Sequence, residues 1–205
     1  FVGIETPDVA SLRETKKTQN MQDDLLTSVR RLYSFGIDVL AGFIVGFDND
    51  RAETFDLQYR FIVDAGIQAA MVGLLTALPR TPLYERLQRE GRLREHADAS
   101  DNTKLSTNVI PKQMTYETLV GGYRSLYERL FDDEAIVQRI ENKMRYMTRP
   151  NYRGEYSVAQ RCVLLWRLLR KGILPGGVRR LAAFWRTLPL RTPSAKASWA
   201  ASRAA

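Results

Sequence analysis

The chain has 205 residues, 44% of them hydrophobic, and a formal net charge of +8 at pH 7. This suffices for one domain with a sizeable core, or for one domain with an appendage. No apolar run reaches the roughly 18 residues that cross a membrane, and no charged-then-apolar leader opens the sequence. A single cysteine and a single histidine exclude an internal disulfide and a self-contained multi-cysteine metal site. We therefore expect a cytoplasmic protein.

Strands and helices are predicted to alternate through the first ninety residues. Asn20 is the expected cap of the first long helix, and Asp50 with Glu53 resembles a capping box for the next one. Strands as apolar as these are buried on both faces, so the alternation predicts an α/β fold with a parallel sheet covered by helices. The predicted elements are strands at 1–4, 37–45 and 69–75 and helices at 21–35, 51–65 and 82–90.

The later part of the chain is predicted to be helical. Apolar residues at helical spacing predict helices at 115–131 and 132–147, and two more follow at 158–169 and 178–188. The predicted divisions are βα units over 1–91, a linker over 92–113, a helical domain over 114–148, basic amphipathic helices over 149–191 and a disordered tail over 192–205.

Three strand ends carry candidate functional residues, because function in parallel α/β folds gathers where strands end. Glu5 ends the first strand, where either a ligand hydroxyl pair such as a ribose or a loop-bracing role would satisfy its carboxylate. Gly42 and Gly46 lie in the second strand, where either a ligand or a neighbouring element can approach closely. Residues 48–50 resemble a metal cluster, but turn and cap chemistry explains them better. The third strand exits at Leu78–Pro79.

Together and in this order, three motifs resemble the last half of the radical SAM barrel. They are Gly-Ile-Glu-Thr-Pro at 3–7, Gly-Phe-Ile-Val-Gly at 42–46 and Leu-Pro-Arg-Thr-Pro-Leu-Tyr at 78–84. The similarity is strongest to the subgroup with an N-terminal cobalamin-binding domain, which includes the hopanoid methylases. Residues from about 110 to Met144 resemble the uncharacterised C-terminal domain of that subgroup. The resemblance implies the C-terminal half of a partial (βα)6 TIM-like radical SAM barrel, followed by an all-helical region, within a longer enzyme.

The resemblance also implies seven contacts to S-adenosylmethionine. The adenine would contact Gly42, Ile44 and Gly46 of the second strand and Leu78 and Pro79 at the exit of the third. The ribose would contact Glu5 at the end of the first strand, and the methionine carboxylate would contact Lys17 in the segment after that strand. Arg80 departs from the pattern, in which glycine is usual. No catalytic residue and no metal ligand is assigned.

The chemistry of the family needs a Cys-x-x-x-Cys-x-x-Cys loop that binds a 4Fe-4S cluster. The single Cys162 cannot supply this loop; its apolar helical setting predicts a buried structural thiol. The resemblance implies that the cluster and cobalamin bind elsewhere in the longer enzyme. It also implies that a flavodoxin or ferredoxin reduces the full enzyme. It further implies radical methyl transfer to a small hydrophobic or lipid-like substrate, with this chain inactive alone. The alternative is a non-catalytic binding or membrane-docking module that retains half of the enzyme fold.

The positive charge is concentrated near the C-terminus. Residues 1–144 hold 18 Lys/Arg and 22 Asp/Glu, whereas residues 145–205 hold 13 Lys/Arg and one acidic residue. Within 156–191 these cations alternate with apolar residues, including Trp166 and Trp185. Such helices suit peripheral contact with the inner membrane surface. They also suit nucleic acid, the least favoured of the three interpretations. The most favoured is a helix pair that packs its apolar face on the barrel while its arginines are solvated.

Overall fold

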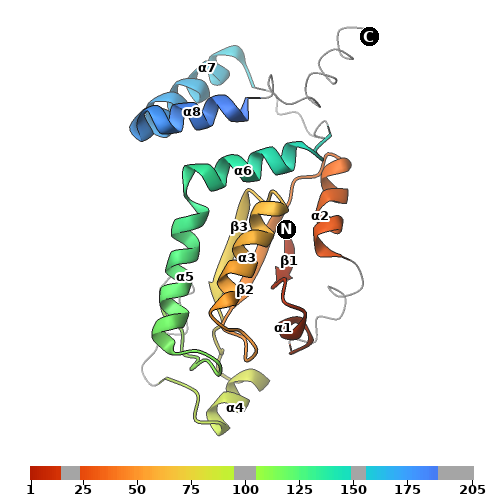
Figure 1. The fold of residues 1–205 in the computed structure, drawn as a ribbon, viewed down its shortest axis with the longest axis vertical. Helices are drawn as coiled ribbons and strands as arrows, with labels where there is room; N and C mark the ends of the chain where they lie inside the picture. Colours follow the sequence, from red (N-terminus) through yellow and green to blue (C-terminus); the bar gives the residue numbers. More distant parts are fainter. Residues whose placement is uncertain (15–23, 95–104, 149–155, 189–205) are drawn as a thin grey trace.

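The protein has an α/β fold built on a three-stranded parallel sheet (Figure 1). The computed structural model describes residues 1–14, 24–94, 105–148 and 156–188. The strand order β1-β2-β3 follows the chain, and each crossover passes through helices, as the apolar strand pattern predicted. The α/β prediction is therefore confirmed. The strands are β1 (Val2–Glu5), β2 (Leu40–Val45) and β3 (Ala69–Leu74).

Local sequence signals account for most helix boundaries. The Asp24 carboxylate accepts the Thr27 backbone N–H at 3.0 Å, and the Thr81 hydroxyl accepts that of Tyr84 at 3.2 Å. The predicted cap Asn20 and the predicted tail 192–205 lie outside the described residues. A short helix after β1 was not predicted. The helices of this part are α1 (Val9–Glu14), α2 (Leu25–Ser34), α3 (Glu53–Asp64) and α4 (Pro82–Arg89).

One face of the sheet is covered by helices and holds the main core. In β2, Ala41, Phe43 and Val45 are buried, and they alternate with Gly42 and Ile44 on the opposite face. Helix α3 lies over this sheet face, and its side chains join the core together with residues of α2 and the helix α5 (Tyr116–Leu130) (Figure 1). The core residues from the helices are Val29, Tyr33, Phe55, Ile62, Leu119, Tyr123, Leu126 and Leu130.

Helix α5 closes the free edge of β3. The Tyr127 hydroxyl accepts the Val72 N–H at 3.1 Å and donates to the Val72 carbonyl at 2.8 Å. The Tyr123 hydroxyl donates to the same carbonyl at 3.0 Å. Both backbone groups of an edge residue are thus satisfied by side chains where a further strand would otherwise pair. Among the described residues the sheet therefore ends at β3, and a helix forms its border.

Helix α6 (Asp133–Met144) crosses the end of the sheet opposite to α4 (Figure 1). It is fixed by Arg139, a buried residue whose guanidinium donates to four backbone carbonyls, those of Ile67, Gln68, Leu130 and Ala135. Burial lowers the pKa of Arg139 from its ordinary value. Because these carbonyls belong to the α3–β3 loop, to α5 and to α6, one side chain ties three elements together.

The C-terminal helices lie beyond α6, on the side away from the sheet (Figure 1). Helix α8 (Gly177–Thr187) packs on α6, to which Arg180 and Arg186 are ion-paired, but neither α8 nor α7 (Val158–Arg167) contains a fully buried residue. The helix pair was expected to pack on the barrel with its arginines solvated; among the described residues α8 instead packs on α6, where Arg180 and Arg186 form ion pairs. Cys162 is exposed, so the predicted buried thiol is wrong. No helix within the described ranges is both long and apolar enough to span a membrane.

Candidate functional site

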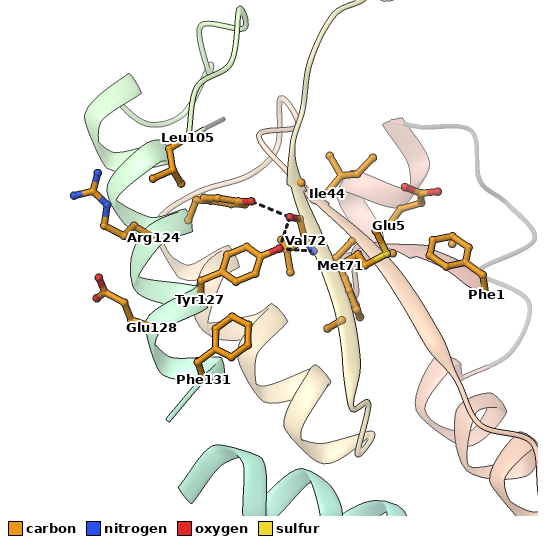
Figure 2. A pocket seen from close by; sticks show the side chains of 16 residues that line it. Phe1, Glu5, Ile44, Met71, Val72, Leu105, Arg124, Tyr127, Glu128 and Phe131 are labelled. Carbon is orange, nitrogen blue, oxygen red and sulfur yellow. Dashed lines mark hydrogen bonds between the residues drawn. The ribbon is translucent and has the colours of Figure 1, made fainter. Parts of the chain in front are cut away.

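The face of the sheet opposite to α3 carries a cavity of about 910 Å³ (Figure 2). Its floor comes from all three strands and one wall from α5. This volume lies within the range of small-molecule sites, and most of the lining is apolar. The lining residues are Phe1, Gly3, Glu5, Gly42, Phe43, Ile44, Ala70, Met71, Val72, Gly73, Leu105, Tyr123, Arg124, Tyr127, Glu128 and Phe131.

Small residues on adjacent strands leave space at the floor of the cavity. Gly3 of β1 pairs with Gly42 of β2, which pairs with Met71 of β3, and Ile44 pairs with Gly73 in a neighbouring row. A Cβ atom on Gly42 would lie 2.8 Å from the ring of Phe1, so a side chain there would displace that ring. The absence of a side chain at Gly42 therefore lets a flat group, here the Phe1 ring, approach the backbone of β2 closely.

Glu5 lies at one end of the cavity in an uncommon backbone conformation. Its φ is 68°, in the left-handed region, and β1 holds one extra residue relative to β2 between Gly3 and Glu5. A non-glycine residue in this conformation costs on the order of 1–3 kcal/mol and clusters at ligand sites. Glu5 is half-buried and lines the cavity beside Gly42 and Ile44.

Asp50 organises the loop after β2. Its carboxylate accepts the backbone N–H groups of Gly46 at 2.7 Å and Phe47 at 3.0 Å, and the Ser11 hydroxyl at 2.8 Å. Burial raises the pKa of Asp50 above its usual range, against the opposing effect of these hydrogen bonds. The predicted capping box is wrong, because α3 begins after Ala52 without a side-chain cap. Asp50 instead satisfies N–H groups at the end of β2 and holds α1 against them.

Asp48 joins the same loop to α4. Its carboxylate oxygens lie 2.8 Å from an Arg86 nitrogen and 2.7 Å from an Arg92 nitrogen. Burial raises the pKa of Asp48, but the hydrogen bonds and charges of the two arginines outweigh it and hold this pKa below its usual value. The carboxylates of Asp48 and Asp50 are thus bonded to guanidinium, backbone and hydroxyl groups of the surrounding loops and helices.

The exit of β3 is held by residues from the segment before α5. Asn108 accepts the Ala77 N–H at 2.9 Å and donates to the Ala77 carbonyl at 2.7 Å, and the buried Thr107 donates to Leu75. Leu78 and Pro79 follow and are exposed. Arg80 has φ 67°, a conformation that favours glycine, which gives a physical reason for the glycine of the family pattern.

Only part of the predicted cofactor site comes together at the cavity. Glu5, Gly42 and Ile44 line it, whereas Gly46, Leu78 and Pro79 lie past the ends of β2 and β3 and do not. Lys17 lies outside the described residues. The aromatic α5 wall was not predicted as part of a site, because Tyr123 and Tyr127 have the spacing of ordinary core residues. The pair of hydrogen bonds between Asn108 and Ala77, called the Asn108 clamp below, gives no local sequence signal.

Comparisons with known proteins agree on one group. Residues 81–199 match a family described as "Domain of unknown function (DUF4070)". Among curated proteins, the hopanoid C-2 methylase of Rhodopseudomonas palustris is 36% identical over 146 residues, 71% of this chain and 26% of that protein. The bacteriochlorophyllide d C-12(1)-methyltransferase of Chlorobaculum tepidum is 27% identical over 69% of this chain and 30% of its own length. The anaerobic magnesium-protoporphyrin IX monomethyl ester cyclase of Cereibacter sphaeroides is 27% identical over 60% and 19%.

These relatives define the class: radical SAM methyltransferases and cyclases. The chain belongs to the DUF4070 family, the C-terminal domain of the hopanoid-methylase-like group of radical SAM proteins. The resemblance predicted from the strand-end motifs is confirmed. The chain spans between about a fifth and a third of the length of the curated relatives it matches.

Proposed function

We propose that the chain supplies the last three βα units of a partial (βα)6 radical SAM barrel, and with them half of an S-adenosylmethionine pocket. Residues 1–91 would form these units, 92–113 a linker, 114–148 the helical domain and 149–191 the basic helices. The observation that carries the proposal is Glu5, held in the left-handed region at a cavity whose floor includes the in-register pair Gly3 and Gly42.

The residues at the cavity fit the adenosine part of this cofactor. Gly42 and Ile44 would lie under a purine that takes the place of the Phe1 ring over Gly42, and the Glu5 carboxylate can accept hydrogen bonds from ribose hydroxyls. Gly46, Leu78 and Pro79 would border the same ligand from the strand ends, and Lys17 would face its carboxylate. When bound, S-adenosylmethionine supplies the radical and methyl chemistry of the group. The 4Fe-4S cluster and cobalamin would bind elsewhere in the longer enzyme, and a flavodoxin or ferredoxin would reduce that enzyme.

The apolar remainder of the cavity favours a small hydrophobic or lipid-like substrate. Met71, Leu105 and Phe131 line it and are 61%, 48% and 69% exposed. Burying such side chains against a ligand contributes about 1.5–3 kcal/mol each. The chain alone would be inactive, because it lacks the cluster cysteines. A non-catalytic binding module remains the alternative, and binding of the cofactor separates the two.

The test is cofactor binding by the intact enzyme that contains this segment. Glu5→Gln removes the charged acceptor at nearly constant volume and is expected to weaken S-adenosylmethionine binding roughly 10- to 100-fold, as for the loss of a charge-assisted hydrogen bond. Equilibrium dialysis with labelled cofactor measures this without turnover. The matched control is Glu117→Gln, an exposed glutamate of α5, which should leave the dissociation constant unchanged. Equal affinity of wild type and Glu5→Gln would contradict the proposed ribose contact.

We also propose that the C-terminal helices dock on the inner surface of a cytoplasmic membrane. Residues 156–188 contain seven Arg/Lys and no Asp/Glu, and α7 and α8 expose large apolar side chains. Leu165 and Trp166 are 53% and 54% exposed, and Trp185 is 55% exposed. Tryptophan with arginine on an exposed helix suits an anionic lipid surface. The apolar exposure favours lipid over nucleic acid, because phosphate contacts alone need only the cations.

Liposome co-sedimentation tests the membrane contact. Binding is expected to be stronger with phosphatidylserine than with phosphatidylcholine alone and to weaken as salt increases. Trp166→Ser should weaken partitioning about tenfold, since it removes a large apolar side chain from the interface. Phe35→Ser, at an exposed position of similar exposure after α2, is the control and should have no effect. Equal binding to neutral and anionic vesicles would remove the proposal.

A further inference from the structure

A second apolar cavity lies between α6 and the C-terminal helices. Its volume is about 500 Å³, and it is lined from α6 by Ile136 and Ile140 and from the opposite side by Ile173, Ala183 and Phe184. We propose that this cavity binds the hydrocarbon part of a monomeric lipid-like molecule. The inference deepens the proposed function and rests on its hydrophobic substrate.

The polar groups of the lining are already bonded to protein atoms. The Arg180 guanidinium lies 2.8 Å from the Asp133 carboxylate and donates to the Gly172 carbonyl at 3.2 Å. The Thr187 hydroxyl donates to the Phe184 carbonyl at 2.8 Å. A ligand that brought its own polar groups would have to compete with these bonds, whereas a hydrocarbon leaves them intact. The lining therefore selects an apolar occupant.

Phe131 connects this cavity with the cavity over the sheet. It follows the last residue of α5, lines both cavities, and is 69% exposed. Its ring stacks on that of Tyr127, with 6.0 Å between the ring centres. Figure 2 shows Phe131 at the end of the α5 wall that lies nearest to α6. The apolar surface thus continues from the sheet cavity, past one aromatic ring, into the cavity beside the basic helices.

The position of the second cavity also favours a lipid-like ligand. Its outer wall is α8 and the π-helical segment Leu168–Ile173, the same elements that expose apolar and basic side chains. A molecule that left a membrane at these helices would meet this cavity before the cavity over the sheet. The exposed cations around it, such as Arg170 and Lys171, complement an anionic membrane surface, and the apolar lining complements a hydrocarbon.

Binding of a pyrene-labelled decanol, displaced by n-alkanols from hexanol to dodecanol, tests this site in the full chain without cofactor. Each added methylene is expected to tighten competition about fourfold until the cavity is filled. Ala183→Phe fills the cavity from α8, and Ile136→Trp fills it from α6. Each should weaken probe binding about fifteenfold, as expected when roughly two methylenes no longer fit. The control is Ala182→Phe, the same substitution at the exposed neighbour of Ala183.

The outcomes separate this site from the other proposals. Unchanged binding in both filled variants, or an equal loss in Ala182→Phe, would overturn it. Vesicle binding should be the same for Ala183→Phe and wild type. If Ala183→Phe lost vesicle binding together with probe binding, the residues of the second cavity would insert into a bilayer and would not hold a single molecule, which would contradict the proposal. Because alkanol binding is measured without S-adenosylmethionine, failure of the Glu5→Gln test would leave this result standing, and the converse also holds.

Discussion

Gly122→Ala is expected to lower the free energy of unfolding by about 3 kcal/mol, at the upper end of the usual cost of overpacking. Gly122 lies in α5 where this helix meets α3, and an added Cβ would come 2.2 Å from Cε2 and 2.5 Å from Cδ2 of Phe55. The Phe55 ring is 6% exposed and is surrounded by the core, so it cannot move aside without shifting α3 or α5. Urea denaturation followed by circular dichroism measures the change.

The adjacent Gly121 provides a matched control. It lies in the same helix, and an added Cβ would meet no atom within 4 Å. Gly121→Ala should therefore stabilise the protein by up to about 1 kcal/mol, because alanine has the higher helix propensity. The two single-methyl substitutions are expected to have opposite signs. Similar effects of both would show that α5 does not pack on α3 through Gly122.

Arg139→Met is expected to lower the free energy of unfolding by about 3 kcal/mol. Methionine keeps much of the aliphatic volume but leaves the carbonyls of Ile67 and Leu130 without their charged donor, and a buried hydrogen bond from a charged group contributes about 1.5–3 kcal/mol. The shortest of these bonds, from Arg139 to Leu130, is 2.6 Å. For a chain of this size the expected decrease in Tm is about 6–12 °C, measurable by calorimetry.

Two further variants give this prediction its controls. Arg139→Lys keeps the charge but cannot donate to carbonyls on both sides at once, so an intermediate loss is expected. Gln138→Ala changes the exposed neighbour, whose amide donates to Glu134 at 3.3 Å, and should cost less than about 0.5 kcal/mol. If Arg139→Met were as stable as Gln138→Ala, the guanidinium would not hold α6 in place.

Local signals in the sequence were sufficient for the order and type of most elements. The helix predicted at 51–65 is Glu53–Asp64, and the strand predicted at 69–75 is Ala69–Leu74. The helix predicted at 82–90 is Pro82–Arg89, and Thr81 caps it. These predictions succeed because apolar periodicity and caps act between residues only a few positions apart. The predicted capping box does not form, because the Asp50 carboxylate accepts the backbone N–H groups of Gly46 and Phe47 instead.

The motifs alone thus identified the family and placed Glu5, Gly42 and Ile44 at one site. The tertiary structure decided which residues surround them. The Tyr127–Val72 and Arg139–Ile67 bonds join residues 55 and 72 positions apart, and the Asn108 clamp spans 31 positions. Such contacts depend on how α5 and α6 pack on the sheet, and nothing in the local pattern of tyrosine, arginine or asparagine distinguishes them from ordinary core or surface residues. Strand-end chemistry is local in sequence, whereas the walls of a cavity come from whichever elements the packing brings to it.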